Sequence, residues 1–300
     1  MAKNVGFLGL GRMGLPMARN LAAAGYTVHV FDVARPALDR AAAHNGIITY
    51  ASPRELAARV AVLFSALPND AIVRESYLGR DGVLAGAAAG LITCDCSTVS
   101  PEVSLSISGA ATAKDVTHMD TPMLGSSPQA ESGEIFFMVG GEPTAMPLIQ
   151  PFLDVMGRLT MYVGASGTGN RIKLLHNALG AVNAVAVAES LALCVKLGVD
   201  PVTYADVVRN GGGMAYSTYF DRRATRIIEG RYDPTFTAEL MLKDVTLAAQ
   251  MAGDSLPDLR ILREALTAFG EASKQWGGED FSAVTHVIED RLGTNISRGS

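Results

Sequence analysis

The sequence predicts two domains of different class: an α/β domain with a doubly wound parallel sheet in residues 1–164, and an all-helical domain in residues 165–300. Short runs rich in β-branched and aromatic residues alternate with helical patterns up to Gly164, which is typical of a parallel sheet with crossover helices. Beyond that point we find helical patterns and no convincing strand. The length of 300 residues fits two domains, and a long apolar helix near residues 168–197 joins them.

A glycine turn joins the first predicted strand to the first predicted helix. The apolar run Val5–Leu8 leads into Gly-x-Gly-x-x-Gly, and a helical pattern follows from Arg12 to Ala24. In a dinucleotide-binding unit the first glycine permits the turn, the second lets the backbone approach the pyrophosphate, and the third lets the helix pack on the strand. Free N–H groups at the helix N-terminus then face the phosphates. We therefore expect a Rossmann fold that binds its cofactor through Gly9, Gly11, Arg12, Met13 and Gly14.

The second predicted strand, Thr27–Phe31, ends in Asp32, close to where such a unit needs an acid for the adenosine ribose. A carboxylate there accepts from the 2′-hydroxyl and repels a 2′-phosphate, so we expect NAD in preference to NADP. A helix cap for the segment that follows is the other interpretation of Asp32. Arg35, three residues later, is able to bind a phosphate and leaves NADP open.

The remaining elements of the first domain follow the same alternation. Helices are predicted near Arg35–His44, after the Ser52-Pro53 cap, from Ser100-Pro101 and over Thr144–Met156. Strands are predicted at Ile47–Tyr50, Ala61–Leu67, Leu91–Cys96, Asp115–Asp120, Ile135–Val139 and Leu159–Val163. Ligands of doubly wound sheets bind at the carboxyl edge, where the break at residues 67–69 lies. The turn-rich segment Thr121–Pro128 is expected to be irregular.

The second domain begins with the long helix. Its small residues recur every fourth position, which permits close helix packing, at Gly180, Ala184, Ala188 and Ala192. A transmembrane span is the rival interpretation, but two asparagines and Glu189 interrupt the run, so we expect a helix buried in its own core or in a subunit interface. Later helices are predicted from Asp200-Pro201 and near Ala215–Ile228, Thr237–Met251, Pro257–Gln275 and Phe281–Arg291.

The composition excludes several classes of function. With 48% hydrophobic and 18% charged residues, the chain is typical of a soluble globular protein. The net charge of −5, without a long basic run, argues against nucleic acid as a partner, and we expect no membrane partner. Three cysteines make no disulfide framework, and no pair at zinc-ligand spacing accompanies Cys94 and Cys96, so we expect no metal. The first residues lack a signal-peptide layout, which predicts a cytoplasmic protein.

Lys173 and Asn177 are the candidate catalytic side chains. They lie four residues apart at the start of the long helix and therefore share one face, which we expect to point towards the interdomain cleft. An ammonium and an amide placed in this way can orient a small oxygenated substrate and transfer a proton. A solvated lysine beside a packing asparagine is the simpler interpretation from periodicity alone. His176, from the same turn, is a rival acid or base that we expect to serve in packing.

At this point the sequence resembles a known family. The run from Gly6 to Gly25 is similar to the cofactor signature of the β-hydroxyacid dehydrogenases, the group that contains 3-hydroxyisobutyrate dehydrogenase and tartronate semialdehyde reductase. Four further segments agree with this family: Ser97-Thr98, Asp120-x-Pro122 with Gly125 and Gly133, Gly167-x-Gly169-x-x-x-Lys173-x-x-x-Asn177, and Lys243-Asp244. The resemblance covers nearly the whole chain, and its segments occur in the family's order.

The resemblance implies an oxidoreductase that moves a hydride between NAD(P) and a small 3-hydroxy acid or semialdehyde, and that forms a homodimer or homotetramer. Lys173 would be the catalytic acid/base, and Asn177 would hold the substrate. The resemblance further implies cofactor contacts from Leu67, Pro68, Thr98 and Lys243, and substrate contacts from Ser97, Leu124, Gly125 and Ser126.

One segment departs from the family. Its substrate segment usually reads Ser-Gly-Gly, whereas this chain has Leu124-Gly125-Ser126, so reaction type is better supported than substrate identity. Ser126 or Ser127 would take over the hydroxyl role, or Leu124 would shape a pocket for another substrate. An imine reductase-like protein and a non-catalytic dinucleotide-binding scaffold are the alternative functions. Two roles are considered for Tyr219, Arg222 and Arg223: they bind an anion, or they are surface residues.

Overall fold

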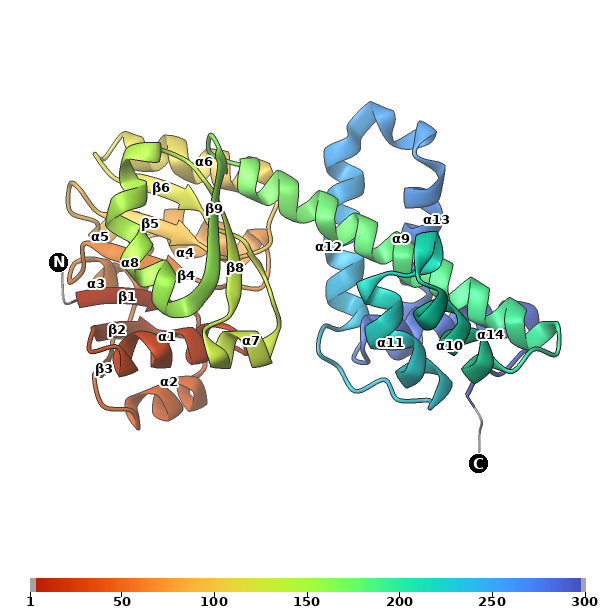
Figure 1. Ribbon diagram of the computed structural model, residues 1–300. Helices are drawn as coiled ribbons and strands as arrows, with labels where there is room; N and C mark the ends of the chain where they lie inside the picture. The colour runs from red at the N-terminus through yellow and green to blue at the C-terminus, as the bar shows by residue number, and fades with distance from the viewer. Residues whose placement is uncertain (1–3, 298–300) are drawn as a thin grey trace. The chain divides into compact units, whose positions relative to one another are not determined.

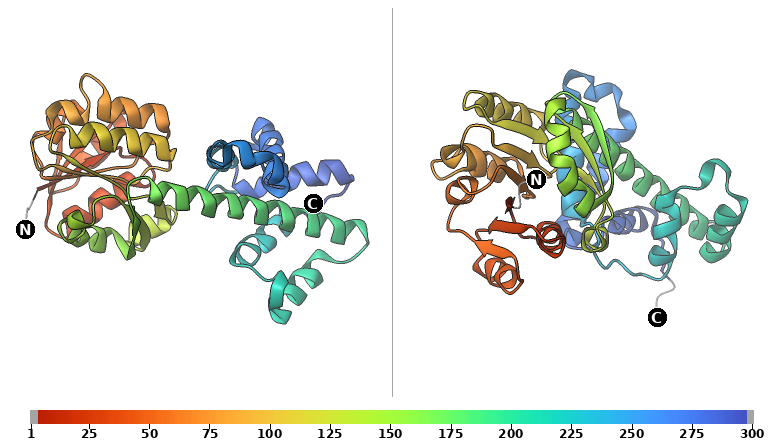
Figure 2. Two further views of the ribbon diagram at one scale, coloured as in Figure 1. Left: turned by 90° about the horizontal axis from the view of Figure 1, so that it is seen from above. Right: turned by 60° about the vertical axis from the view of Figure 1, so that its left-hand side comes forward.

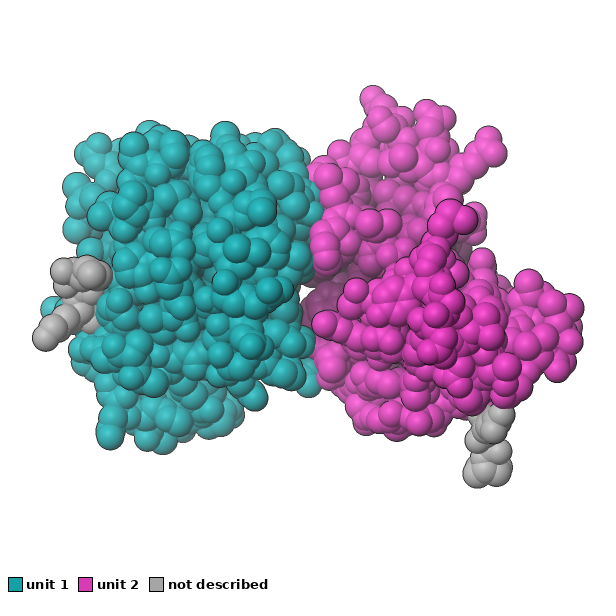
Figure 3. All heavy atoms as spheres, viewed as in Figure 1, with its two compact units in different colours: residues 1–173 teal, residues 174–300 magenta. Residues whose placement is uncertain are grey.

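The computed structural model describes residues 4–297, which fall into two compact units divided between Lys173 and Leu174 (Figure 3). Each unit has its own elements and its own apolar cores. The long helix α9, Thr168–Lys196, begins in the first unit and continues through the second (Figure 1).

The first unit contains the sheet that the sequence predicts. Its strands are β1 Asn4–Leu8, β2 Thr27–Phe31, β3 Ile47–Thr49, β4 Val62–Ser65, β5 Ile92–Asp95, β6 Thr117–Asp120, β7 Met123–Leu124, β8 Ile135–Gly140 and β9 Gly157–Gly164. The strand order is β3-β2-β1-β4-β5-β6-β8-β7, with β9 pairing to β8. All neighbours from β3 to β6 run parallel, which confirms the doubly wound, Rossmann-like arrangement.

The sheet departs from a purely parallel one at β7 and β8. β8 runs antiparallel to both β6 and β7, although β9 is again parallel to β8. The connection from β7 to β8 holds only the short helix α7, Ser127–Ser132, and strands joined by a short connection pair in antiparallel fashion. The segment Thr121–Pro128, expected to be irregular, therefore contains a strand and the start of a helix.

Helices cover both faces of the sheet (Figure 2). The helices of this unit are α1 Gly14–Ala23, α2 Arg35–Ala42, α3 Pro53–Ala57, α4 Asp70–Leu78, α5 Val83–Gly86, α6 Pro101–Thr112, α7, and α8 Met146–Met156 after a 3₁₀ turn at Pro143–Ala145. On one face α1 and α8 pack on the sheet around Phe7, Leu21, Phe64 and Phe152. On the other face α4 and α6 pack around Leu63, Val73, Tyr77 and Ile107. The sequence pattern predicted no element for residues 70–90, where α4 and α5 lie.

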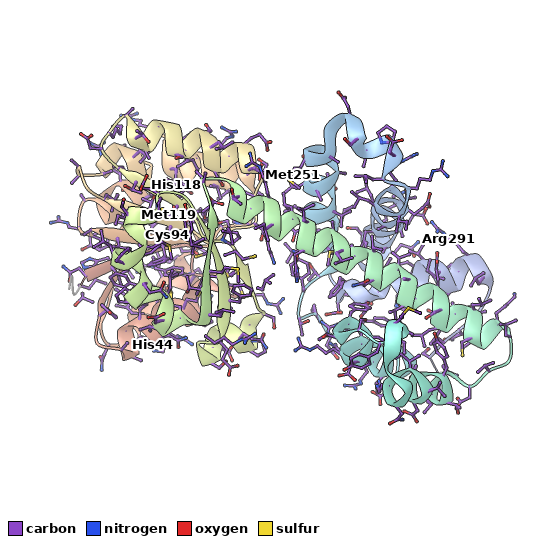
Figure 4. The ribbon with its side chains drawn as sticks, turned by 45° about the horizontal axis from the view of Figure 1, so that its top comes forward. His44, Cys94, His118, Met119, Met251 and Arg291 are labelled. Atoms are coloured by element: carbon purple, nitrogen blue, oxygen red, sulfur yellow. The ribbon has the colours of Figure 1, made fainter. Side chains whose placement is uncertain are left out.

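Neighbouring residues of β5 and β6 belong to different layers: Cys94 and Met119 to the core on the α1 side, and His118 to the side of Tyr77 in α4. Cys94, His118 and Met119 are labelled in Figure 4. Cys94 and Met119 are register partners in the core on the α1 side. Thr93 and His118 are register partners too, and the threonine hydroxyl lies 2.9 Å from Nδ1 of the histidine. Burial lowers the pKa of His118 to about 3, so this ring is neutral inside the protein. The α4 side of the sheet is therefore the layer with buried polar groups.

The second unit is helical, apart from one isolated β-bridge between Thr237 and Asp280 in its described part. Besides α9 it contains α10 Pro201–Gly211, α11 Thr218–Ile228, α12 Ala238–Ala252, α13 Arg260–Trp276 and α14 Val284–Leu292, with 3₁₀ turns at Gly213–Ala215, Gly253–Asp258 and Phe281–Ala283. Within α9 the alanines at positions 184, 188 and 192 are fully buried, which confirms their packing role. By length and composition α9 could cross a membrane, but half of its most apolar window is buried within the structure.

His286 of α14 lies between two glutamates and two aromatic rings. Its Nδ1 is 3.1 Å from Oε2 of Glu289, its Nε2 is 3.6 Å from Oε2 of Glu279, and its ring contacts Tyr232 and Trp276. Burial lowers the pKa of His286, but the hydrogen bond to Glu289 and the charges of both glutamates outweigh that effect and raise it. A raised pKa stabilises the fold below the unfolded value of about 6.5, and this stabilisation is lost as pH rises through the folded value.

We therefore expect His286→Gln to lower the melting temperature more at about pH 5.5 than at about pH 8.5. Thermal unfolding followed by the fluorescence of Trp276, the single tryptophan of the chain, measures this difference. His44→Gln, in the first unit, is the control. Equal losses at both pH values for His286→Gln would contradict the expected proton linkage.

Candidate functional site

The glycine turn between β1 and α1 has the geometry that phosphate binding needs. Gly9 has φ of +89°, and its N–H donates to Phe31 O at 2.9 Å, which ties the turn to the end of β2. A Cβ on Gly14 would collide with the carbonyl oxygen of Gly9, so this helix packs closely only with glycine there. A Cβ on Gly11, in contrast, would meet no atom within 4 Å. The backbone at Gly11 is thus bare and open, which fits a cofactor pyrophosphate.

Asp32 is held by the backbone on both sides. Its Oδ2 accepts from Leu10 N at 2.6 Å and its Oδ1 from Ala34 N at 2.7 Å. The N-cap residue of α2 is Ala34, without a side-chain cap hydrogen bond, so Asp32 is not the cap of that helix. Each oxygen keeps further acceptor capacity for a ribose hydroxyl. The carboxylate opens into a pocket of about 590 Å³, within the range of small-molecule sites, lined by Phe31, Asp32, Val33, Arg35, Leu38, Thr49, Tyr50 and Ala51.

Arg35 lies in the same pocket, but it has a partner already. Its Nε lies 2.9 Å from Oδ1 of Asp39, one helical turn later, and both side chains are more than half exposed. An exposed pair of this kind is weak and can rearrange. The pocket is therefore lined by the carboxylate of Asp32, which the backbone holds in place, and by the guanidinium of Arg35, which is paired with Asp39.

The loops after β4 and β5 are joined by a buried hydrogen-bond network. Ser65 and Ser97 donate from their hydroxyls to Oδ1 of Asp95, each at 2.6 Å, and Tyr77 OH lies 2.8 Å from Ser65 Oγ. Leu67 N donates to Ser97 Oγ at 2.8 Å. Burial raises the pKa of Asp95, and the hydrogen bonds from both serines oppose that shift. The Ser97 hydroxyl, expected to bind substrate, is thus engaged between Asp95 and Leu67.

The segment Leu124-Gly125-Ser126 lies between β7 and α7. Leu124 pairs with Phe136 of β8, and Gly125 has φ of +149° with Ile135 too close for a side chain. Ser126 donates to Oε1 of Gln129 from its N at 2.9 Å and from its Oγ at 2.6 Å, as the N-cap residue of α7. The donors of Ser126 therefore serve the start of α7, and a substrate at this segment would meet the Leu124 side chain and the Gly125 backbone.

The first turn of α9, which precedes Lys173, is fixed by a distant carboxylate. Asp120, fully buried at the end of β6, accepts from Gly167 N at 2.7 Å and from Asn170 N at 3.1 Å. Burial raises the pKa of Asp120, and these backbone hydrogen bonds oppose the shift. A Cβ on Gly169 would lie 2.7 Å from Oδ2 of Asp120, which explains the glycine.

Asn170 adds a second attachment within the same turn. Its Oδ1 accepts from Val99 N at 3.3 Å, and its Nδ2 donates to Ser104 Oγ at 3.0 Å. The start of α9 is thereby bound both to β6 and to the loop after β5. Lys173, one turn further along the helix, is 9% exposed.

Asn177 is oriented from within the second unit. Its Nδ2 donates to Oδ2 of Asp244 at 2.5 Å, and its Oδ1 lies 3.0 Å from Nδ1 of His176. Asp244 is 1% exposed, and its Oδ1 also lies 3.1 Å from Nζ of Lys243. His176 thus contacts the asparagine side chain, and one buried carboxylate holds both Asn177 and Lys243.

Four residues that fix these side chains were not among the predicted site residues: Asp95, Asp120, Asn170 and Asp244. Asp120 and Asp244 do lie in segments that resemble the family, and Asp95 stands inside an apolar strand, where a carboxylate is seldom buried without a partner. Arg223, one of the residues considered for anion recognition, forms an ion pair with Asp280 at 2.9 Å. Its side chain is 14% exposed and the carboxylate is fully buried, so this arginine is part of the helical core.

Two family models match the chain. The model described as the NAD-binding domain of 6-phosphogluconate dehydrogenase covers residues 4–164, and the model described as NAD-binding of NADP-dependent 3-hydroxyisobutyrate dehydrogenase covers residues 167–288. Together they span both units, and they meet within three residues of Gly164.

Relatives of known activity match over nearly the full length. The chain is 33% identical to 2-(hydroxymethyl)glutarate dehydrogenase of Eubacterium barkeri, with 98% of each chain covered. It is 34% identical to 3-hydroxyisobutyrate dehydrogenase of Pseudomonas aeruginosa, over 96% of this chain and 99% of the relative. Among solved structures, the Mycobacterium tuberculosis 3-hydroxyisobutyrate dehydrogenase with L-serine is 30% identical with a TM-score of 0.89, covering 96% of this chain and 99% of that one.

Proposed function

The chain belongs to the β-hydroxyacid dehydrogenase family, and from this premise we propose which residues carry the reaction and which substrates it takes. It is an oxidoreductase that moves a hydride between NAD(P) and a small hydroxy acid. The observation that carries the assignment of roles is the buried anchoring of the first turn of α9, because Lys173 lies one turn beyond the residues that Asp120 and Ser104 hold. The imine reductase and scaffold alternatives are not favoured over this function.

NAD(P), when bound, accepts or returns the hydride at its nicotinamide ring. The open backbone at Gly11 and the acceptor capacity of Asp32 fit the pyrophosphate and the ribose of this cofactor. We assign the further contacts to the cofactor to Arg12, Met13, Leu67, Pro68, Thr98 and Lys243. The boundary between the cofactor-binding and helical domains is placed at residues 164/165.

Lys173 is the acid/base of the proposed mechanism. During oxidation the neutral amine of Lys173 takes the proton of the substrate hydroxyl while a hydride leaves the carbon that bears this hydroxyl. During reduction the ammonium of Lys173 returns the proton to the oxygen. Asn177, four residues later on one face of α9, donates or accepts at the same oxygen. Because Asp244 takes one N–H of Asn177, the amide is held in one orientation. Positioning of this kind supplies much of the rate of a proton transfer.

The substrate class follows from the segment after β6. Ser97, Leu124, Gly125 and Ser126 are the proposed substrate contacts, and within them Leu124 supplies an apolar surface where the family usually has a serine hydroxyl. The donors of Ser126 are directed at Gln129. We therefore propose a 3-hydroxy acid or semialdehyde with an aliphatic substituent that packs on Leu124, in preference to a highly hydroxylated acid.

The preferred cofactor is proposed to be NAD. Asp32 is a fixed anion in the pocket, whereas Arg35 is paired with Asp39. Asp32→Asn is expected to shift the ratio of kcat/KM for NADP over NAD upwards by about 100-fold, because like charges placed together cost several kcal/mol and each 1.4 kcal/mol is about tenfold. Initial rates with both cofactors measure this ratio. A wild-type enzyme that prefers NADPH would contradict the proposal.

A homodimer or homotetramer in the cytoplasm is the proposed form of the enzyme. In the second unit three leucines of α9 are more than half exposed, Leu175, Leu179 and Leu193, and so is Leu197, directly after the helix. An exposed apolar surface of this kind marks an interaction site in soluble proteins. NAD(P) is a cofactor of the cell interior, which supports the location. Light scattering of the purified protein gives the number of subunits.

An initial-rate screen tests the function. Absorbance of the reduced nicotinamide is followed with NAD and NADP across 3-hydroxyisobutyrate, 2-(hydroxymethyl)glutarate, 3-hydroxypropionate, glycerate, serine and threonate, and with a cyclic imine in the reductive direction. We expect turnover of an aliphatic 3-hydroxy acid with NAD, and slower turnover of glycerate and threonate. Leu124→Ser should reduce the difference in turnover rate between the aliphatic 3-hydroxy acid and the more hydroxylated acids, glycerate and threonate. Reduction of the imine without oxidation of any acid, or cofactor binding without turnover, would overturn the proposal.

A further inference from the structure

The loops after β4 and β5, from which the proposed function takes cofactor contacts, are linked at two places: by Ser97 next to β5, and by Ser100, which donates from its N and Oγ to Asp70 at 3.1 and 2.5 Å. Leu67 follows β4 and Ser97 follows β5, and the N–H of Leu67 donates to the hydroxyl oxygen of Ser97 at 2.8 Å. Ser97 is 3% exposed, so water does not readily substitute for this contact. The position of Leu67 against the end of β5 is therefore set by the orientation of the Ser97 hydroxyl.

That orientation is set in turn by Asp95. A hydroxyl has one proton, and the proton of Ser97 goes to Oδ1 of Asp95 at 2.6 Å, which leaves only lone pairs to face Leu67 N. Ser97 N also donates to the same carboxylate oxygen at 3.2 Å. The carboxylate, 1% exposed, thus fixes both the backbone and the side chain of the residue that receives the Leu67 amide.

The carboxylate is itself held from the neighbouring strand. Ser65 is the register partner of Asp95 and donates its hydroxyl proton to Oδ1 at 2.6 Å. Because that proton is used, the contact of 2.8 Å between Tyr77 and Ser65 has the tyrosine as donor. The chain of donors therefore runs in one direction, from α4 through β4 to the end of β5.

We propose that Asp95 is a positioning residue for the nicotinamide half of the cofactor, acting through Ser97 on the loop that begins at Leu67. This inference rests on the proposed function for the cofactor contacts of Asp32 and of residues 67, 68 and 98: with the ribose of the adenosine half at Asp32, after β2, the loops after β4 and β5 on the other side of β1 take the nicotinamide half. Asp32, the proposed contact of the adenosine half, directly follows β2 and has its own hydrogen bonds from the backbone N–H groups of Leu10 and Ala34. Asp95 accordingly acts on one end of the cofactor and not on the other.

The test compares two ligands that differ by the nicotinamide ring. Dissociation constants for NAD and for ADP-ribose are measured by calorimetry on the full-length protein and on Ser97→Ala, Asp95→Ala and Asp95→Asn. Ser97→Ala and Asp95→Ala are expected to raise the Kd for NAD about threefold to tenfold, the effect of about one hydrogen bond, with ADP-ribose unchanged within about twofold. The Kd for NAD of the double variant, Asp95→Ala with Ser97→Ala, should be no higher than the higher of the two single-variant values, because both substitutions act through one contact.

Asp95→Asn separates positioning from stability. Its amide oxygen still accepts from both serines, so NAD affinity should stay within about threefold of wild type. Its amide nitrogen takes the place of Oδ2, which has no hydrogen-bond partner among the described residues, so the melting temperature should fall. Thr93→Val is the matched control: it lies on the same face of β5, is fully buried and loses a hydrogen bond to His118, but does not reach either loop.

Three results would overturn the inference: an unchanged Kd for NAD in Ser97→Ala, an equal rise for ADP-ribose, or the same weakening in Thr93→Val. The outcome does not depend on turnover. A wild-type enzyme that binds NAD but oxidises none of the hydroxy acids would contradict the proposed function, while the ratio of the two dissociation constants would still decide the role of Asp95.

Discussion

Replacing Lys173 with methionine is expected to lower kcat by about 10²- to 10⁴-fold, the usual contribution of a positioned acid/base. Methionine keeps the length and apolar stem of the side chain and removes only the amine. The first turn of α9 stays attached through Asp120 and Asn170, so the Kd for NAD should remain within about twofold. Stopped-flow absorbance at the reduced nicotinamide band, with a deuterated substrate to expose the hydride step, gives the rate.

Arg171 provides the matched control for this substitution. It is a cation on the same turn of α9, two residues before Lys173, and it is exposed. Arg171→Met should leave kcat within about twofold of wild type, since exposed charges contribute little. Small primary amines added to Lys173→Ala should restore part of the rate. Full activity of Lys173→Met, or an equal loss in Arg171→Met, would exclude Lys173 as the acid/base.

The elements of the first unit were predictable where local chemistry decides them. The strand Thr27–Phe31 has the bounds that its β-branched residues predicted, and Ser52 caps α3 by accepting from Glu55 N at 3.1 Å. The cap depends on a contact between residues three apart, and the strand is marked by the β-branched residues of its own segment. The helices between 70 and 90 escaped notice because short helices with mixed patterns give weak periodicity, although Asn69 caps α4 in the same way as Ser52 caps α3.

Contacts between distant segments were not predictable in the same way. Asp120 lies 47 residues before Gly167, and Asn177 lies 67 residues before Asp244, so no local pattern links either pair. Their side chains meet only because the fold brings the end of β6 to the start of α9, and α12 to α9. The motif spacing thus indicated which residues matter, whereas the contacts that orient them had to be read from the structure.

Arg223 shows the same limit in the second unit. From the sequence, an arginine on an amphipathic helix is open to anion binding or to a place on the surface. In the structure its Nε and Nη2 donate to Asp280 at 2.9 and 3.3 Å, and its guanidinium lies 5.4 Å from the ring centre of Phe281. The carboxylate that neutralises it is 57 residues away in sequence. The positive charge of Arg223 is therefore neutralised within the second unit.

Asp280→Ala is expected to lower the free energy of unfolding of the helical unit by about 3–5 kcal/mol, the cost of leaving a buried charge without its partner. Asp280 also accepts from the N and Oγ1 of Thr235, at 3.2 and 3.0 Å, and from the N and Oγ of Ser282, at 3.2 and 2.9 Å. Removing the carboxylate takes the acceptor from these donors and the counter-ion from Arg223, whose guanidinium then keeps only its hydrogen bond to Thr235 Oγ1 among the described residues. Urea unfolding followed by Trp276 fluorescence reports on this unit, because Trp276 is the chain's single tryptophan.

The burial of the Arg223–Asp280 pair decides how much it contributes to the free energy of unfolding. Arg231 and Glu229 form another pair in the same unit, but both side chains are about half exposed, and Arg231→Ala should cost only about 0–1 kcal/mol. Replacing both members of the buried pair, as Arg223→Met with Asp280→Ala, should cost less than Asp280→Ala alone, because no charge is then left unpaired. If the double variant were the less stable one, the hydrogen bonds of Asp280 to Thr235 and Ser282 would be its main contribution. If Asp280→Ala cost no more than Arg231→Ala, the pair would contribute nothing to the helical core.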